Sequence, residues 1–182
     1  MPDTNKQFDE VAAQCRDIFV KKLSDYSASW RIMRPSTLTD QIYIKARRIR
    51  TLQTTGQAMI DEGIYPEFAG IMNYGIVGLI QLELPATTLV DISNEQALKL
   101  YDDLLAQTRE LMLAKNHDYG EAWREMRVSS FTDIILTKIM RIKQIEDHSG
   151  ATLVSEGVDA NYKDIINYSI FALIKLRYDN DD

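Results

Sequence analysis

The chain contains one sequence segment twice. KLSDYSASWRIMRPSTLTDQIYIKARRI begins at Lys22, and KNHDYGEAWREMRVSSFTDIILTKIMRI begins at Lys115, ninety-three positions later. The two segments share Asp-Tyr, Trp-Arg, Met-Arg and Thr-Asp pairs and a closing Lys-x-x-Arg-Ile at matching positions. This agreement indicates a tandem duplication, which favours a fold built from two copies of one unit.

Hydrophobic residues recur at helical spacing in both copies. Residues 7–23 and 93–115 each carry an apolar stripe, and Ser93 with Gln96 has the sequence pattern of a capping box. A second helix is predicted to open at Thr37 in the first copy and at Ser130 in the second, each with Asp three residues later. Third helices over residues 66–84 and 160–178 align at an offset of ninety-four, which indicates one residue gained in the preceding loop.

A three-helix unit exposes an apolar face that it cannot bury alone. We therefore predict a single all-α domain over residues 1–182, a helical bundle with internal pseudo-twofold symmetry that resembles a fused dimer. Repeat 1 covers residues 7–84 and is the degenerate copy, and repeat 2 covers residues 93–178 and preserves its motifs better. The segment 85–93 links them and opens with a proline, which ends the preceding helix.

Charge and composition exclude several classes of partner. With 27 acidic and 21 basic residues the chain has a formal net charge of −6, which disfavours nucleic acid as a partner. No apolar run approaches the roughly 20 residues that span a bilayer. The N-terminal residues lack the pattern of a signal peptide and Cys15 is the single cysteine, so we expect a cytoplasmic protein without a membrane partner. Whether the fused pair forms a further homo-oligomer is left open.

The Asp-Tyr segment of repeat 2 has two interpretations. In the first, Tyr119 and Trp123 anchor the turn between helices while Asp118 holds backbone amides. In the second, the aromatic side chains stack on a base, and Asp118 with Lys115 and Asn116 binds ribose, phosphate or a metal. Repeat 1 has Leu, Ser and Ser where repeat 2 has Asn116, His117 and Gly120, so the second interpretation applies better to repeat 2.

Lys138 and Arg141 form an i,i+3 pair that recurs as Lys45 and Arg48 in repeat 1. Solvated helix charges are the simpler explanation. A phosphate grip is the alternative, because a Lys point charge and an Arg fork both suit phosphate oxygens. Both interpretations stay open at this point. Further cationic groups near the Asp-Tyr turns could add to an anion site: Arg31, Arg34, Arg124 and Arg127.

Glu156, Asp164 and Asn167 are spaced i, i+8 and i+11, so they share one face if the last helix extends back to Glu156. Carboxylates on one face are hard oxygen ligands, and Glu156 with Asp164 is therefore our candidate Mg²⁺ site. The alternative is that the two carboxylates favour the helix dipole at its N-terminus.

Three pieces of repeat 2 together carry a family resemblance: KNHDYGEAW from Lys115, KIMRI from Lys138, and EGVDANYKDIINY from Glu156. They resemble the nucleotide modification associated domain 1 family, first catalogued as a domain of unknown function. That family is distantly similar to the MazG-like all-α nucleoside triphosphate pyrophosphohydrolases, in which helix carboxylates hold Mg²⁺. The resemblance implies nucleotide binding and a link to nucleotide metabolism or modification.

Two functions follow as hypotheses. The first is a protein that binds a nucleotide or a small phosphorylated ligand, with pyrophosphohydrolase-like turnover as its finer form. In this form Glu156 and Asp164 hold Mg²⁺, Lys138 and Arg141 contact the phosphates, and Tyr119 or Trp123 contacts the base. The second is a catalytically silent binding or assembly module, in which Asp118, Trp123 and Arg141 form a structural network. The sequence does not decide whether the chain is an enzyme.

Overall fold

The computed structural model describes residues 2–56, 63–152 and 156–179. Every regular element in these ranges is helical, as predicted. Two short 3₁₀ helices, η1 and η2, follow the first helix of each repeat, and a π-helical segment, η3, continues the last helix. In chain order the elements are α1 (Thr4–Tyr26), η1 (Ser29–Ile32), α2 (Pro35–Thr55), α3 (Ile64–Glu83), α4 (Asn94–Tyr119), η2 (Ala122–Glu125), α5 (Val128–Asp147), α6 (Val158–Ile174) and η3 (Lys175–Asp179).

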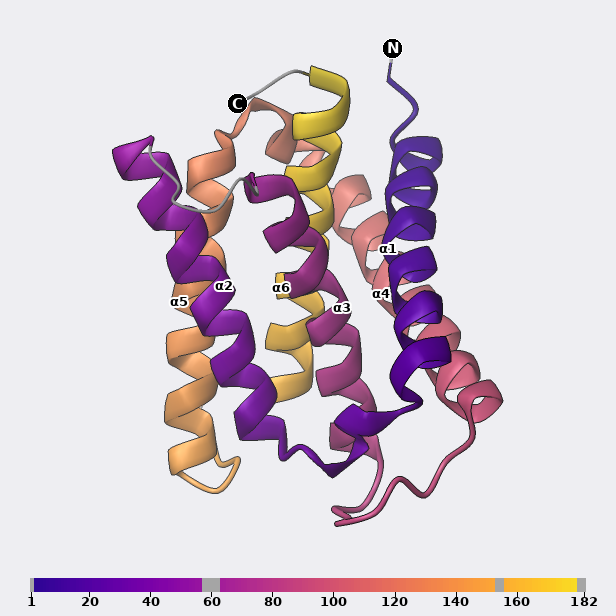
Figure 1. Cartoon of the computed structure of the whole chain (residues 1–182). Helices are drawn as coiled ribbons and strands as arrows, with labels where there is room; N and C mark the ends of the chain where they lie inside the picture. The colour runs from indigo at the N-terminus through magenta and orange to yellow at the C-terminus, as the bar shows by residue number, and fades with distance from the viewer. Residues whose placement is uncertain (1, 57–62, 153–155, 180–182) are drawn as a thin grey trace.

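The helices form three layers around one hydrophobic core. Figure 1 shows α3 and α6 side by side at the centre, with α2 and α5 on one flank and α1 and α4 on the other. The central pair is in close contact: a Cβ atom at Gly75 of α3 would lie 2.6 Å from Ile166 Cγ1 of α6. The side chains of α3 and α6 therefore supply much of the core that both repeats share.

Helix starts agree with the sequence pattern in one case and differ in two. Ser93 caps α4 as predicted, with its side chain accepting from Gln96 N while the Gln96 side chain accepts from Ser93 N. The prediction that α2 opens at Thr37 is wrong, because Pro35 takes the first helical position, where its missing N–H costs nothing. The prediction for Ser130 is wrong as well: Arg127 has extended backbone, and α5 begins at Val128 without a side-chain cap.

Several contacts occur twice, with the roles of the two repeats exchanged. A bidentate pair joins Arg16 of α1 to Asp102 of α4 at 2.7 Å, and its counterpart joins Arg109 of α4 to Asp9 of α1 at 2.7 Å. Each residue of the second pair is ninety-three positions from its counterpart in the first. Reciprocal contacts are what a twofold axis generates, so they support the predicted pseudo-twofold relationship. Ion pairs between α2 and α5 repeat in the same way, Lys143 with Asp40 and Arg50 with Asp133.

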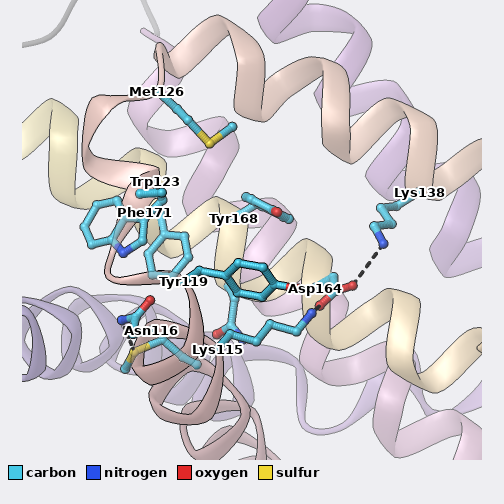
Figure 2. A pocket seen from close by; sticks show the side chains of 12 residues that line it. Lys115, Asn116, Tyr119, Trp123, Met126, Lys138, Asp164, Tyr168 and Phe171 are labelled. Carbon is cyan, nitrogen blue, oxygen red and sulfur yellow. Dashed lines mark hydrogen bonds and ion pairs between the residues drawn. The ribbon is translucent and has the colours of Figure 1, made fainter.

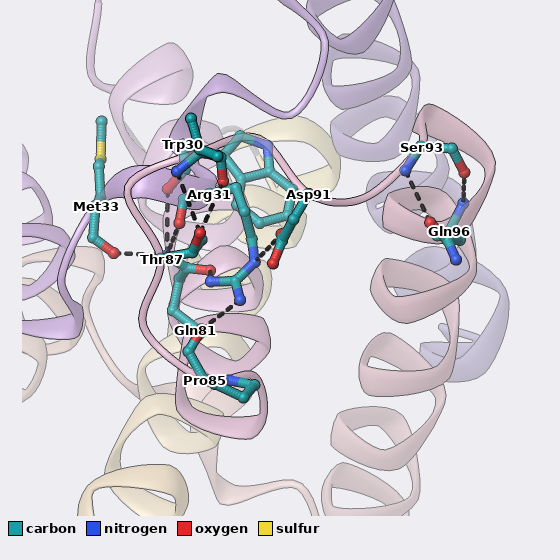
Figure 3. A network of polar contacts seen from close by, with 10 residues as sticks. Trp30, Arg31, Met33, Gln81, Pro85, Thr87, Asp91, Ser93 and Gln96 are labelled. Atoms are coloured by element: carbon teal, nitrogen blue, oxygen red, sulfur yellow. Dashed lines mark hydrogen bonds and ion pairs between the residues drawn. The ribbon is translucent and has the colours of Figure 1, made fainter.

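The linker between the repeats is held by a buried arginine. Figure 3 shows Arg31 of η1 among the end of α3 and the linker. Its guanidinium donates to Gln81 Oε1 at 3.0 Å and to the Pro85 carbonyl, and it pairs with Asp91 at 2.9 Å. The amide of Gln81 in turn donates to the Arg31 carbonyl at 2.9 Å. Arg31 therefore holds the linker against the end of α3. The sequence alone instead places it among the cationic groups of a candidate anion site.

None of the helices described is long and apolar enough to cross a membrane.

Candidate functional site

A cavity of about 330 Å³ opens between the end of α4, the short helix η2 and one face of α6. Figure 2 shows the side chains that line it. Asp164, Asn167, Tyr168 and Phe171 are spaced i, i+3, i+4 and i+7 along α6, so one helix face supplies a carboxylate, an amide and two rings in order. The cavity therefore has a charged end and an aromatic end.

The charged end is built around Asp164, which is only 4% exposed. Lys115 of α4 donates to its Oδ1 at 2.6 Å, and Lys138 of α5 donates to its Oδ2 at 3.0 Å. Partial burial alone lowers the pKa of Lys115, but the hydrogen bond and attraction to Asp164 outweigh burial and leave this pKa raised. Lys115 is therefore cationic at neutral pH, and one carboxylate holds two lysine side chains in the cavity wall.

The aromatic end is formed by Trp123 and Phe171. Their rings stack with centroids 4.2 Å apart and an interplanar angle of 4°, and Tyr168 meets Phe171 edge to face. Arg124 covers the Trp123 ring, with its guanidinium carbon 4.5 Å from the ring centroid. Tyr119 lies at the end of α4 and is 74% exposed, so its ring forms the rim of the cavity. Phe171 and Arg124 cover the two faces of the Trp123 ring, so the exposed ring of Tyr119 is the flat face open to a planar ligand, while Trp123 and Phe171 form the wall beside it.

Asn167 lies between the two ends and is 5% exposed. Its Nδ2 donates to the Thr108 carbonyl of α4 at 3.2 Å. No described residue donates to its Oδ1, and the indole Nε1 of Trp123 likewise has no acceptor among the described residues. Two residues of the cavity lining thus each have one buried polar atom, an acceptor on Asn167 and a donor on Trp123, without a partner in the described part of the chain. Buried polar groups in native proteins almost always have partners, so these two require an explanation.

Seven of the ten site residues predicted from sequence line this one cavity. They are Lys115, Asn116, Tyr119, Trp123, Lys138, Asp164 and Asn167.

The other three predicted residues lie outside the cavity lining. The Asp118 side chain is 74% exposed and lies beside His117. Arg141 and Glu156 are exposed. Asp118, Trp123 and Arg141 do not form the mutual network that the silent-module hypothesis expects, because Trp123 packs on Phe171 while the other two face solvent.

The predicted Mg²⁺ ligands are not on one helix face. Helix α6 begins at Val158, so Glu156 precedes the helix and its carboxylate does not extend the face that carries Asp164. Both Asp164 oxygens already accept from lysines. Within the described ranges, no group of three His, Cys, Asp or Glu side chains could hold a metal ion. This donor set fits a bound cation poorly, and the Mg²⁺ site stays a prediction.

Sequence reasoning missed five residues of the cavity wall: Met112, Ala122, Met126, Tyr168 and Phe171. Tyr168 and Phe171 continue the helical spacing that begins at Asp164, so this spacing could have identified them as residues on the same helix face. Met112 and Met126 gave no such signal, because apolar residues on these segments are equally typical of a core. Burial next to Asp164 raises the pKa of Tyr168, and its phenol is therefore neutral in the cavity.

The corresponding part of repeat 1 has a different arrangement of charges. Gly70 stands where Asp164 stands in repeat 2. Lys45, the counterpart of Lys138, instead pairs with Glu67 at 3.4 Å, and Arg48 donates to the same carboxylate at 2.9 Å. In repeat 1, the Lys-x-x-Arg pair therefore forms ion pairs with Glu67 of α3. Glu62, the predicted counterpart of Glu156, lies outside the described residues.

The fold and cavity define an all-α bundle with a site in its second half that combines lysines, a carboxylate and stacked rings. The model of the nucleotide modification associated domain 1 family matches residues 22–82 and 115–176, together more than half of the chain. The chain belongs to this family, and the two matched segments agree with the duplication. No curated protein and no solved structure matches the chain.

Proposed function

We propose that the cavity of repeat 2 binds a nucleotide, with the phosphate at Lys115 and Lys138 and the base against the aromatic end. The observation that carries this proposal is the order of groups along the cavity: two lysines around Asp164 at one end, and the Trp123–Phe171 stack at the other. A nucleotide presents an anionic group and a planar ring at its two ends. The family name, which refers to nucleotide modification, supports the same class of ligand.

The arrangement of the lysines favours an anion over a metal cation. Each Asp164 oxygen already accepts from a lysine, so a metal cation at this carboxylate would lie beside two ammonium groups that repel it. A phosphate instead accepts further N–H bonds from the same two lysines. Magnesium-dependent pyrophosphohydrolysis, the finer form of the hypothesis, needs a metal site beyond these residues. We therefore propose nucleotide binding as the function, and the experiment that tests it also measures nucleotide hydrolysis.

The test is isothermal titration calorimetry with a panel of ribo- and deoxyribonucleotides, followed by chromatography of the same mixtures with and without Mg²⁺. Lys138→Met should weaken binding about tenfold or more, because a charge-assisted hydrogen bond of about 1.5–3 kcal/mol is lost. Lys45→Met is the matched control, since Lys45 holds a carboxylate in repeat 1 and lies outside the cavity lining. The Lys45→Met variant should bind the nucleotide with the same affinity as the unchanged protein.

The outcomes separate the hypotheses. Binding without turnover supports the proposal. Monophosphate and pyrophosphate released only with Mg²⁺ would restore the hydrolase hypothesis. An absence of binding across the whole panel would contradict the proposal and favour the catalytically silent module.

A further inference from the structure

Asn167 and Asn73 occupy matching positions in the third helices of the two repeats. Asn73 donates from Nδ2 to the Cys15 carbonyl at 2.9 Å, just as Asn167 donates to the Thr108 carbonyl. Asn73 Oδ1 also accepts from the Tyr101 hydroxyl at 2.6 Å. The amide of each Asn is therefore oriented by a backbone carbonyl, which fixes the direction of its oxygen.

Repeat 2 lacks the donor that repeat 1 uses. The position that corresponds to Tyr101, ninety-three residues earlier, is Phe8, which has no hydroxyl. Asn167 Oδ1 accordingly has no donor among the described residues, although the side chain is buried and lines the cavity. Leaving a buried acceptor unpaired is costly, and a ligand that donates a hydrogen bond would remove this cost.

The charges of the cavity limit the number of phosphates. Among the described residues that line it, the charged side chains are Lys115, Lys138 and Asp164, which sum to one positive charge. A single phosphate ester carries about −1.5 to −2 at neutral pH. A triphosphate adds two further charged groups, which proteins usually neutralise with metal ions and more cations. The cavity volume of about 330 Å³ is also at the small end for a ligand site.

We propose that the ligand is a nucleoside monophosphate, with its one phosphate at Lys115 and Lys138 and a hydrogen-bond donor of the nucleoside at Asn167 Oδ1. This inference rests on the proposed function and makes it more specific. Asp164 and Phe171 are seven residues apart on α6, about 10 Å along the helix axis. That separation matches one phosphate, a sugar and a base in line.

The experiment measures the affinity of the full chain for a matched series on one base: nucleoside, monophosphate, diphosphate and triphosphate. Ribose 5-phosphate and inorganic phosphate complete the series, and each titration is run with EDTA and again with Mg²⁺. The monophosphate should bind at least about tenfold tighter than the nucleoside, the triphosphate and the two base-free phosphates. The series is repeated across the bases, since the cavity lining does not favour one of them.

Asn167→Leu tests the role of the amide, and Asn73→Leu is its matched control. Both variants lose a bond to a backbone carbonyl, so both should lower the melting temperature, and Asn73→Leu at least as much because it also loses the Tyr101 bond. Only Asn167→Leu should weaken monophosphate binding, by about tenfold. If Asn167→Leu does not fold, the ligand series on the unchanged chain still tests the inference.

Failure of this inference differs from failure of the proposed function. Tighter binding of the triphosphate in either buffer would overturn the monophosphate inference and leave nucleotide binding standing. Equal binding of ribose 5-phosphate would overturn it as well, because the base would then contribute nothing. No binding of any nucleotide would contradict both.

Discussion

Trp123 of η2 lies face to face on Phe171 of α6, with the ring centroids 4.2 Å apart. This stack fixes the short helix after α4 against the last helix of the bundle, and it also forms the aromatic end of the cavity. The pair therefore contributes to stability, and in the proposed function it also contacts the ligand.

A double-mutant cycle measures the coupling within this pair. Trp123→Leu and Phe171→Leu keep the site apolar and remove the stacking, so the coupling energy should be about 0.5–1.5 kcal/mol. Urea unfolding of the two single variants and the double variant gives this value. A coupling energy near zero would show that the stack adds nothing beyond burial.

Tyr101→Phe should destabilise the chain by about 0.5–1.5 kcal/mol, because the buried Tyr101 no longer donates to Oδ1 of the partly buried Asn73. The change reproduces in repeat 1 the situation of Asn167 in repeat 2. Tyr43→Phe is the control, since the Tyr43 hydroxyl contacts Arg47 at an exposed position, and surface changes of this kind cost less than about 0.5 kcal/mol. Equal stability of the two variants in urea would contradict the role assigned to the Tyr101 hydroxyl.

Glu146→Gln should alter the dependence of stability on pH. Burial, with Asp40 and Asp147 nearby, raises the pKa of Glu146 above its ordinary value of 4.5, although Thr39 donates to it. The protonated form is therefore favoured in the folded chain: the contribution of Glu146 is fully present below pH 4.5 and is lost as pH rises through its folded-state pKa.

The Gln variant lacks this titration, so it should gain stability relative to the unchanged chain as pH rises towards neutrality. Repeat 1 already has Gln53 at the matching position. Melting curves over a pH series provide the measurement, with Glu110→Gln as an exposed control. A Gln variant whose stability runs parallel to that of the unchanged chain at every pH would refute the raised pKa.

Cys15 should resist thiol reagents in the folded chain. Burial raises the pKa of its thiol from 9.0 to about 12, so the reactive thiolate is rare at mildly alkaline pH. The corresponding stability contribution is fully present below pH 9.0 and is lost as pH rises towards about 12. Labelling with a chromogenic disulfide should be slow in buffer and fast in urea. Fast labelling of the folded chain would contradict the burial of this thiol.

The duplication and the apolar spacing were together sufficient to predict the helical bundle, because apolar spacing and the Ser93 cap are local properties of the sequence. The starts of α2 and α5 were predicted wrongly, since the extended backbone at Arg34 and Arg127 begins each helix without a side-chain cap. The capping-box patterns at Thr37 and Ser130 therefore predicted starts that lie inside the two helices.

The site was predictable only in part for a related reason. Lys115 and Asp164 are forty-nine positions apart, and their ion pair depends on how α4 and α6 pack. Motif spacing placed both residues among the candidates but could not pair them. The exposed positions of Asp118 and Arg141 also depend on packing, which explains why motif membership alone did not separate them from the cavity residues.

The most direct test of nucleotide binding in repeat 2 is a ¹H–¹⁵N spectrum of the indole groups during titration with a nucleoside monophosphate. The chain has two tryptophans, Trp30 and Trp123, and a Trp30→Phe variant assigns their signals. The Trp123 signal should move as ligand is added while the Trp30 signal stays in place, because of these two only Trp123 lines the cavity. A spectrum in which neither signal moves, or in which only Trp30 responds, would contradict the site.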